Sequence, residues 1–202
     1  MDPEPRCITS FLHIACRMRF AGTKVTQGEA EPQREESTDT SSSNKDNGTL
    51  RGRPQNLQPG DTVLRIHIQK WGFKDATLFQ QPRVVLSVRD EQGEVLEAVQ
   101  ETPVSKGGTH QYIFFDHTVY SQTAINRLPS GSAIFFEFKH WKEREKKKSC
   151  KAYSFLEMDE LKDGPAILEA YKKPPNFKRN KQPSLLTTKP LYLHLHLTLE
   201  RQ

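Results

Sequence analysis

The sequence has 202 residues, of which 34% are hydrophobic and 27% charged, with a formal net charge of +5. This length allows one ordinary domain, with or without a long tail, and the apolar content is low for a chain folded throughout. No apolar run approaches the roughly 20 residues that a helix needs to span a bilayer. Composition therefore excludes a helical membrane-spanning protein and predicts one folded domain beside a polar segment.

The polar segment lies on the N-terminal side. Between about Gly22 and Gly60, large apolar side chains are almost missing. Such a stretch cannot bury enough surface to offset its conformational entropy. We therefore predict a disordered polar tail over residues 1–60 and a folded domain over residues 61–202. Residues 29–46 hold six acidic and two basic residues, a net charge of −4, which suits a plain linker or a phosphorylated or autoinhibitory arm.

Within residues 61–202, apolar side chains alternate with polar ones. A period of two is typical of a strand with one buried face. The clearest case is residues 191–199, where every second residue is leucine. The same alternation predicts strands over residues 64–68, 84–88, 112–115 and 134–138, with weaker candidates over 94–101, 151–158 and 166–171 and a short helix over 121–127.

These elements are eight strands with no long amphipathic helix and no alternation of strand and helix. The pattern predicts an all-β fold, an eight-stranded antiparallel β-sandwich, because each sheet can turn one face to a shared core and one to solvent. In such a sandwich, the connections after odd-numbered strands lie at the same end.

Two of these connections are strongly basic. Residues 139–151 hold seven lysines and arginines against Glu143 and Glu145, a net charge of +5. Residues 172–189 hold six basic residues and no acidic one, a net charge of +6. Both runs follow odd-numbered strands, so we predict that they converge at one end.

Aromatic residues accompany these charges, and amphipathic rings favour the headgroup level of a membrane. A basic side chain near an anionic surface contributes about 1 kcal/mol. We therefore predict an anionic phospholipid surface as the partner. Two alternatives are nucleic-acid phosphates and lysines that only maintain solubility. The predicted contact residues are Lys70, Trp71, Lys74, Lys139, His140, Trp141, Lys142, Arg144, Lys146, Lys147, Lys148, Lys151, Lys172, Lys173, Lys178, Arg179 and Lys181.

Long strings of the sequence resemble a known family. They are AIFFEFKHWK (133–142), SFLEMDELKDGP (154–165), YKKPPNFKRNK (171–181) and KPLYLHLHLTL (189–199). They are similar to the C2 domain of the Axin interactor, dorsalization-associated protein family. The resemblance implies a C2 sandwich of type II topology, binding to phosphoinositide or another anionic phospholipid, and a signalling-adaptor role linked to Axin and the JNK pathway. This sequence differs from the family at two places. It has Gln81–Pro82–Arg83 where the family has Asp-Pro-Tyr, and it has a polar segment on the N-terminal side where the family has a helical domain.

Calcium is not expected to take part in binding. A calcium ion needs six to eight oxygen ligands, rich in carboxylates. The connection after the first predicted strand offers Asp75 but has Gln81 where a second carboxylate is expected. The connection after the fifth predicted strand offers only Glu143 and Glu145 among seven cations.

No catalytic motif or cofactor site is expected either, and we predict neither an enzyme nor a small-molecule substrate. His194 and His196 could bind zinc together with His67, although ordinary strand histidines are the plainer interpretation. The odd number of cysteines, three, argues against a disulfide framework. We therefore predict a cytoplasmic protein that associates peripherally with membranes, with a protein–protein adaptor that binds through its sheet faces as the alternative.

Overall fold

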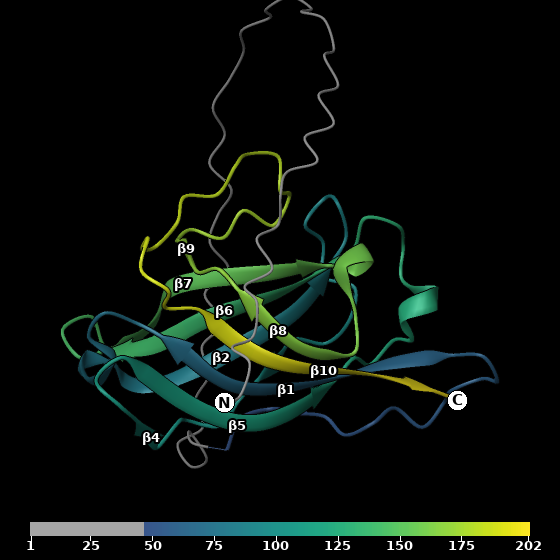
Figure 1. Ribbon diagram of the computed structural model, residues 1–202, viewed down its shortest axis with the longest axis horizontal. Coiled ribbons are helices and arrows are strands. Elements are labelled where there is room, and N and C mark those ends of the chain that lie inside the picture. The colour runs from purple at the N-terminus through teal and green to yellow at the C-terminus, as the bar shows by residue number, and fades with distance from the viewer. Residues whose placement is uncertain (1–46) are drawn as a thin grey trace, which may run out of the picture. The chain divides into compact units, whose positions relative to one another are not determined.

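The computed structural model describes residues 47–202, so the acidic stretch over residues 29–46 and two of the three cysteines lie outside the described residues. The described residues form two antiparallel sheets packed face to face (Figure 1). The first sheet has the order β4 (Gly107–Gly108), β5 (Tyr112–Tyr120), β1 (Thr62–Gly72), β10 (Leu193–Arg201) and β8 (Gly164–Leu168). The second has the order β3 (Gln100–Glu101), β2 (Gln80–Arg89), β6 (Ala133–Lys142), β7 (Lys147–Glu157) and β9 (Tyr171–Lys172).

The helical content of residues 47–202 is three single 3-10 turns, and none is long and apolar enough to cross a bilayer. They are η1 (Ala76–Leu78), η2 (Ile125–Arg127) and η3 (Met158–Glu160). The expected all-β antiparallel sandwich is confirmed, but residues 47–202 form ten strands rather than the expected eight, because Gly107–Gly108 adds a short edge strand and residues 166–171 contribute to two strands.

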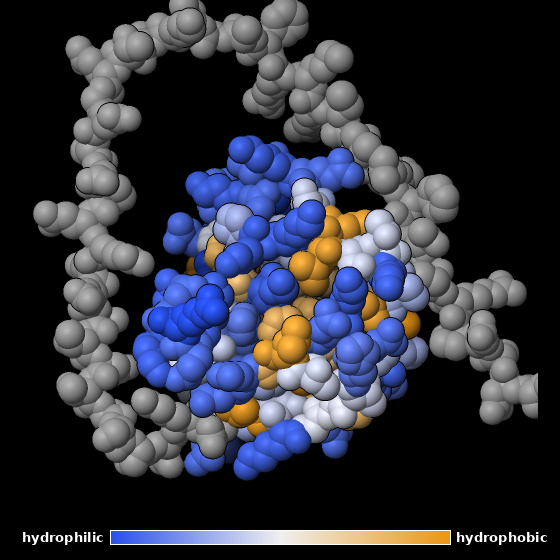
Figure 2. All heavy atoms as spheres, turned by 90° about the vertical axis from the view of Figure 1, so that its left-hand side faces the viewer, coloured by the Kyte–Doolittle hydropathy of each residue, from blue (hydrophilic) through white to orange (hydrophobic). Residues whose placement is uncertain are grey.

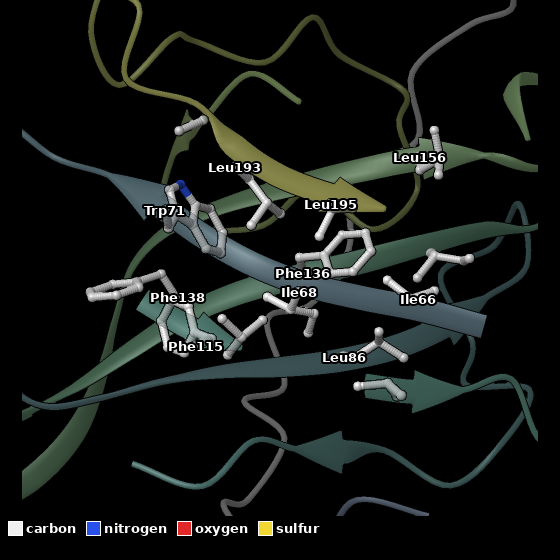
Figure 3. Close-up of a cluster of buried hydrophobic side chains, with 14 of the residues drawn as sticks. Ile66, Ile68, Trp71, Leu86, Phe115, Phe136, Phe138, Leu156, Leu193 and Leu195 are labelled. Atoms are coloured by element: carbon white, nitrogen blue, oxygen red, sulfur yellow. The ribbon is translucent and has the colours of Figure 1, made fainter. Parts of the chain in front are cut away.

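The core lies between the sheets and is built from the inward positions of the alternating strands (Figure 3). Ile66 and Ile68 of β1 face Phe136 and Phe138 of β6, and all four are at most 1% exposed. Each fully buried side chain of this size contributes about 1.5–3 kcal/mol through removal of apolar surface from water. The strongly periodic segments formed strands as expected, because their pattern matches this two-layer burial.

Two weaker strand predictions are wrong in part. Of residues 94–101, only Gln100 and Glu101 form a strand, because the preceding residues make a loop held by one isolated bridge between Arg89 and Val95. The segment 166–171 is not one strand either. It divides between β8 in the first sheet and β9 in the second, and Ala170, in the crossing between them, is buried.

The folded part begins before the predicted start at residue 61. Thr49 donates its amide to the carbonyl of Glu101 at 2.7 Å, and the Thr49 hydroxyl accepts the Glu101 amide at 2.9 Å. Leu50 packs against the core, and the Arg51 amide donates to the side chain of Gln100. Residues 49–53 therefore contact the domain ahead of the predicted boundary at residue 61, through the edge of β3, through Leu50 and through an ion pair between Arg53 and Glu200 at 3.1 Å.

The register places the strand ends at two poles. At one pole β1 ends where β5 and β10 begin, with Gly72 opposite Tyr112 and Trp71 opposite Leu193. β6 also ends there, with Trp141 opposite Gln80 at the start of β2. We call this the basic pole. The other end, where Ala133 pairs with both Arg89 and Glu157, is the opposite pole.

Candidate anionic surface site

The first basic run is a β-hairpin rather than a loop. β6 and β7 stay paired to Lys142 opposite Lys147, so only residues 143–146 form the turn. Lys146 closes this turn with a positive φ of 49°. Strand pairing therefore fixes the backbone of most of the lysines, and the hairpin projects at the basic pole as a defined unit.

The two glutamates of the hairpin are held by its own lysines. Glu145 pairs with Lys142 at 2.6 Å and with Lys147 at 2.9 Å, and Glu143 pairs with Lys146. Hydrogen bonds from Lys142 and Lys147 lower the pKa of Glu145 to about 2, so this carboxylate stays ionised at neutral pH. These pairs neutralise two of the seven basic charges of the run and leave the net charge of +5.

Other cations of the hairpin have no such partner. Within residues 47–202, no carboxylate lies within ion-pair distance of Arg144 or Lys151, and both residues are exposed. Trp141 is half-buried, and its indole N–H donates to Glu143 at 2.8 Å. The ring of Trp141 is therefore anchored at the turn among these charges.

The connection between β1 and β2 packs beside the hairpin. The ring of Phe79 packs edge-on against the ring of His140, with 5.0 Å between the ring centroids. This contact holds residues 73–79 against β6. Leu78 in this connection is 75% exposed, the highest value among the exposed large hydrophobic side chains of the described residues. The space-filling view of this end shows a hydrophilic surface interrupted by hydrophobic patches (Figure 2).

Sequence reasoning missed Leu78. It belongs to no alternating stretch, so no strand pattern drew attention to it. The available signal was its place between Lys74 and Gln80 in a connection rather than a strand. Lys74 is exposed in the same connection, while Lys70 is partly exposed and extends its Nζ over the ring of Tyr112 at 4.6 Å.

One predicted contact residue is excluded by its position. Trp71 is 0% exposed and packs edge-on against Phe138 at 5.7 Å, so it cannot reach a membrane. A break in register between Ile68 and Lys70 explains the difference. Simple alternation after Ile68 would turn Trp71 outward, and the inserted residue reverses the faces.

The second basic run divides between the two poles. Lys172 lies in β9 opposite Ala152, and both Lys172 and Lys173 are exposed. Burial lowers the pKa of His140, with smaller contributions from the charges of Lys142, Lys151 and Lys173. Because β9 pairs with β7 next to Lys151, the start of the second run belongs to the same charged surface as the hairpin.

The middle of this run lies elsewhere. The Nε of Arg179 pairs with Glu157 at 2.9 Å, and Lys178 lines a hollow with Glu91 at the opposite pole. The prediction that the whole run converges with the hairpin is therefore wrong for Lys178 and Arg179. Lys181 belongs to the same excursion, since its carbonyl accepts from the side chain of Asn176.

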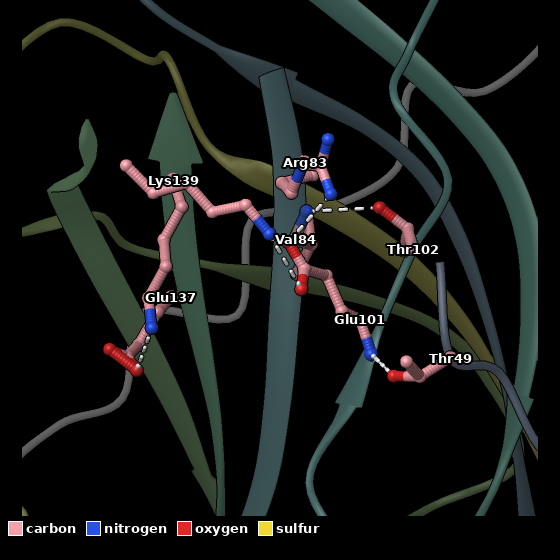
Figure 4. Close-up of polar contacts among 8 residues, drawn as sticks. Thr49, Arg83, Val84, Glu101, Thr102, Glu137 and Lys139 are labelled. Carbon is pink, nitrogen blue, oxygen red and sulfur yellow. Dashed lines mark hydrogen bonds and ion pairs between the residues drawn. The ribbon is translucent and has the colours of Figure 1, made fainter. Parts of the chain in front are cut away.

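A groove of about 560 Å³ opens on the outer face of the second sheet beside the hairpin. Lys139 pairs there with Glu137 at 3.4 Å (Figure 4), and Lys148 pairs with Glu101 at 3.0 Å. Buried Arg83 also reaches Glu101, at 2.9 Å. The groove is lined by Thr49, Val85, Val99, Glu101, Glu137, Lys139, Lys148 and Cys150.

The histidines and the cysteine of the described residues have other partners or surroundings. Among residues 47–202, no three His, Cys, Asp or Glu side chains are grouped so that they could hold a metal ion. His67 lies opposite His196 but directs its Nε2 to Asp116 at 3.1 Å. Burial raises the pKa of the Cys150 thiol to about 11, which keeps it protonated at neutral pH.

The sequence matches a known protein family and several of its curated members. Residues 52–197 match the family described as "Axin interactor dorsalisation-associated protein, C-terminal". The chain is 47% identical over 145 residues to the human "Axin interactor, dorsalization-associated protein", which covers 72% of this chain and 47% of the relative. The zebrafish (Danio rerio) protein of the same name is 48% identical over 144 residues, covering 71% and 47%. The Xenopus laevis protein B is 45% identical over 142 residues, covering 70% and 46%, so the chain spans about half the length of these curated relatives.

Proposed function

This chain belongs to the Axin interactor, dorsalisation-associated protein family through its C-terminal domain, and on that premise we propose that it is a C2-type module that docks on anionic phospholipid. The docking is peripheral and independent of calcium, and it serves a signalling adaptor. The observation that carries the proposal is the meeting, at one pole, of the lysine-rich hairpin with the exposed side chain of Leu78.

The energetics of this pole suit reversible docking. Arg144, Lys151, Lys172 and Lys173 are exposed, and each contributes about 1 kcal/mol near an anionic surface. Burial of the Leu78 side chain in the acyl boundary adds about 1.5–3 kcal/mol. The sum corresponds to a micromolar to submillimolar affinity, which is appropriate for a module that joins and leaves a membrane.

The adjoining groove favours a phosphorylated headgroup. Lys139 and Lys148 are held there by carboxylates, and a phosphate with higher charge density can replace Glu137 or Glu101 as their partner. We propose a phosphoinositide headgroup as the preferred ligand of this groove and the plain anionic surface as the ligand of the hairpin.

Calcium independence follows from the carboxylates at this pole. Asp75 lies 3.7 Å from His110, and Glu143 and Glu145 are engaged by lysines. A dication brought to the hairpin would meet net positive charge rather than free carboxylates.

A protein partner belongs to the same proposal. The relatives are named for interaction with Axin, and an adaptor needs a second binding surface besides its membrane contact. The outer face of the first sheet, which the basic pole and the groove leave free, is the candidate. If the module acts only through proteins, it will ignore vesicles entirely, and that difference separates the two functions.

Vesicle co-sedimentation of the full chain tests the proposal. We expect pelleting with phosphatidylcholine vesicles that contain phosphatidylserine, more with phosphatidylinositol bisphosphate, and little with phosphatidylcholine alone. Pelleting should fall with added salt and persist in EDTA. Pelleting that requires calcium, or preference for an oligonucleotide over vesicles at equal salt, would overturn it.

A further inference from the structure

Residues 173–183 form a strap that leaves β9 and returns beside it (Figure 1, the yellow-green loop after β9). Its base is closed by two backbone hydrogen bonds, from Lys172 to Ser184 at 2.8 Å and from Leu186 to Ala170 at 2.7 Å. Within the strap, the Arg179 amide donates to the carbonyl of Asn176 at 3.1 Å. The strap is therefore a closed loop that is attached to the domain mainly through side chains.

The first attachment is an aromatic one. The ring of Phe177 meets Phe135 edge-on at 5.0 Å, and the guanidinium of Arg89 lies 3.7 Å over the same ring. Phe135 and Tyr153 are at most 2% exposed, and Phe155 and Tyr171 pack against them. The outer face of the second sheet thus carries an apolar socket, and the strap supplies the ring that occupies it.

The second attachment lies two residues further on. The Nε of Arg179 pairs with Glu157 at 2.9 Å, and its Nη2 donates to the carbonyl of Gly131. A hollow of about 520 Å³ surrounds this contact, lined also by Glu91 and Gln92. The Nη1 of Arg179 is buried there without a hydrogen-bond partner among residues 47–202, so the site does not satisfy every donor of its present occupant.

We propose that this face is a peptide-docking site and that the strap is its intramolecular occupant. The site fits an extended segment of a partner protein that carries an aromatic residue followed two positions later by an arginine. The aromatic ring would take the socket of Phe135 and Arg89, and the guanidinium would take Glu157 and the Gly131 carbonyl. This inference does not depend on lipid docking, because the socket and Glu157 lie outside the basic pole.

The tether decides how strongly a partner must bind. A short linker gives its own segment an effective concentration in the millimolar range. A free peptide with the same two contacts therefore competes poorly while the strap is closed, and it binds well once the strap is vacated. A natural partner must add contacts beyond these two, for which the hollow beside Arg179 has room.

The test uses the full chain with Phe177→Ala and Arg179→Ala, which vacates both contacts. The probe is a fluorescein-labelled synthetic peptide with the sequence of residues 174–181, followed by fluorescence anisotropy. We expect saturable binding to this variant and binding at least about tenfold weaker to the unaltered chain.

Matched probes sharpen the outcome. A peptide with alanine in place of Arg179 should lose binding, whereas one with alanine in place of exposed Lys178, which removes the same charge, should retain it. Adding Glu157→Gln to the vacated protein should weaken binding of the original peptide.

The proposal would be overturned if the double variant unfolds cooperatively but does not bind the peptide. It would also be overturned if the two alanine-substituted peptides lose the same amount of affinity. A second form of the protein, with residues 174–183 replaced by a glycine–serine linker of equal length, covers the case in which the double variant does not fold. Exchange of the strap between two copies, seen as a concentration-dependent dimer that excludes the peptide, would also contradict a partner peptide as the occupant.

Discussion

The two basic runs of this protein have nearly the same net charge but lie in different places in the fold. Residues 139–151 carry a net charge of +5 and project from one pole, whereas residues 172–189 carry +6 and divide between the poles. The first run is placed by strand pairing, which continues to Lys142 opposite Lys147. The second is placed by the side chains of Phe177 and Arg179. Charge count alone does not locate charge, because strand pairing and specific side-chain contacts decide where a cation lies.

The largest expected effect comes from reversing charge in each region. Arg144→Glu with Lys151→Glu should weaken binding to phosphatidylserine-containing vesicles by at least roughly 30-fold, since two exposed cations worth about 1 kcal/mol each are lost and repulsion is added. The matched variant, Lys162→Glu with Lys178→Glu, makes the same change in net charge away from the basic pole. Co-sedimentation at one salt concentration compares them, and equal losses would show that only total charge matters.

A smaller effect is expected from the exposed apolar side chain. Leu78→Asp should reduce vesicle binding by roughly tenfold, because insertion of the leucine contributes about 1.5–3 kcal/mol. The melting temperature should change little, since the side chain is 75% exposed. Val95→Asp, at an exposed position near the opposite pole, should leave vesicle binding nearly unchanged. An unchanged affinity for Leu78→Asp would show that docking is purely electrostatic.

The strap should respond to loss of its aromatic attachment. Phe177→Ala removes about 1 kcal/mol of packing or more, which raises the population of the open strap roughly fivefold. Trypsin should then cut after Lys178, Arg179 and Lys181 faster by a similar factor. Cleavage in the hairpin at residues 146–148 should keep its rate, because its attachment is independent. Faster cleavage at both places would indicate global destabilisation instead.

The smallest effect reports on the place where the two runs meet. The pKa of His140 is lowered first by burial and then by Lys142, Lys151 and Lys173, so Lys173→Gln should raise this pKa, measured by NMR titration. Lys178→Gln should not change it.

The same histidine links stability to pH. Because its folded pKa is lowered, the unfolded chain binds more protons below about pH 6.5, and stability falls as the pH drops from 7.5 to 5.5. His140→Gln should remove part of that slope in urea unfolding, and an unchanged slope would contradict the assignment.

Much of the fold could be predicted from the sequence, because burial in a two-layer sandwich imposes a period of two. Residues 64–68, 134–138 and 191–199 show it strongly, and these stretches lie in or overlap the core strands β1, β6 and β10. The hydrogen bonds of Thr49 and Arg51 to β3 could not be predicted, since they depend on an open sheet edge rather than on a local pattern.

The candidate site was only partly predictable. The parity of the strands placed the hairpin at the correct pole, and the lysines within it are adjacent in sequence. The burial of Trp71 could not be predicted, because β1 continues past residue 68 to Gly72 and a single inserted residue after Ile68 turns the Trp71 side chain inward, neither of which the sequence marks. The diversion of Lys178 and Arg179 depends on Glu157 and Phe135, which are distant in sequence.

The most direct test of membrane docking through the basic pole is an environment-sensitive label placed at Leu78→Cys or, as the control, at Val95→Cys, after the three native cysteines are replaced by serine. On addition of phosphatidylserine-containing vesicles, the emission of the label at position 78 should shift to the blue, and the label at position 95 should stay in water. Neither label should respond to pure phosphatidylcholine. A response at position 95 alone, or none at position 78 while the protein pellets with the vesicles, would contradict docking through this pole.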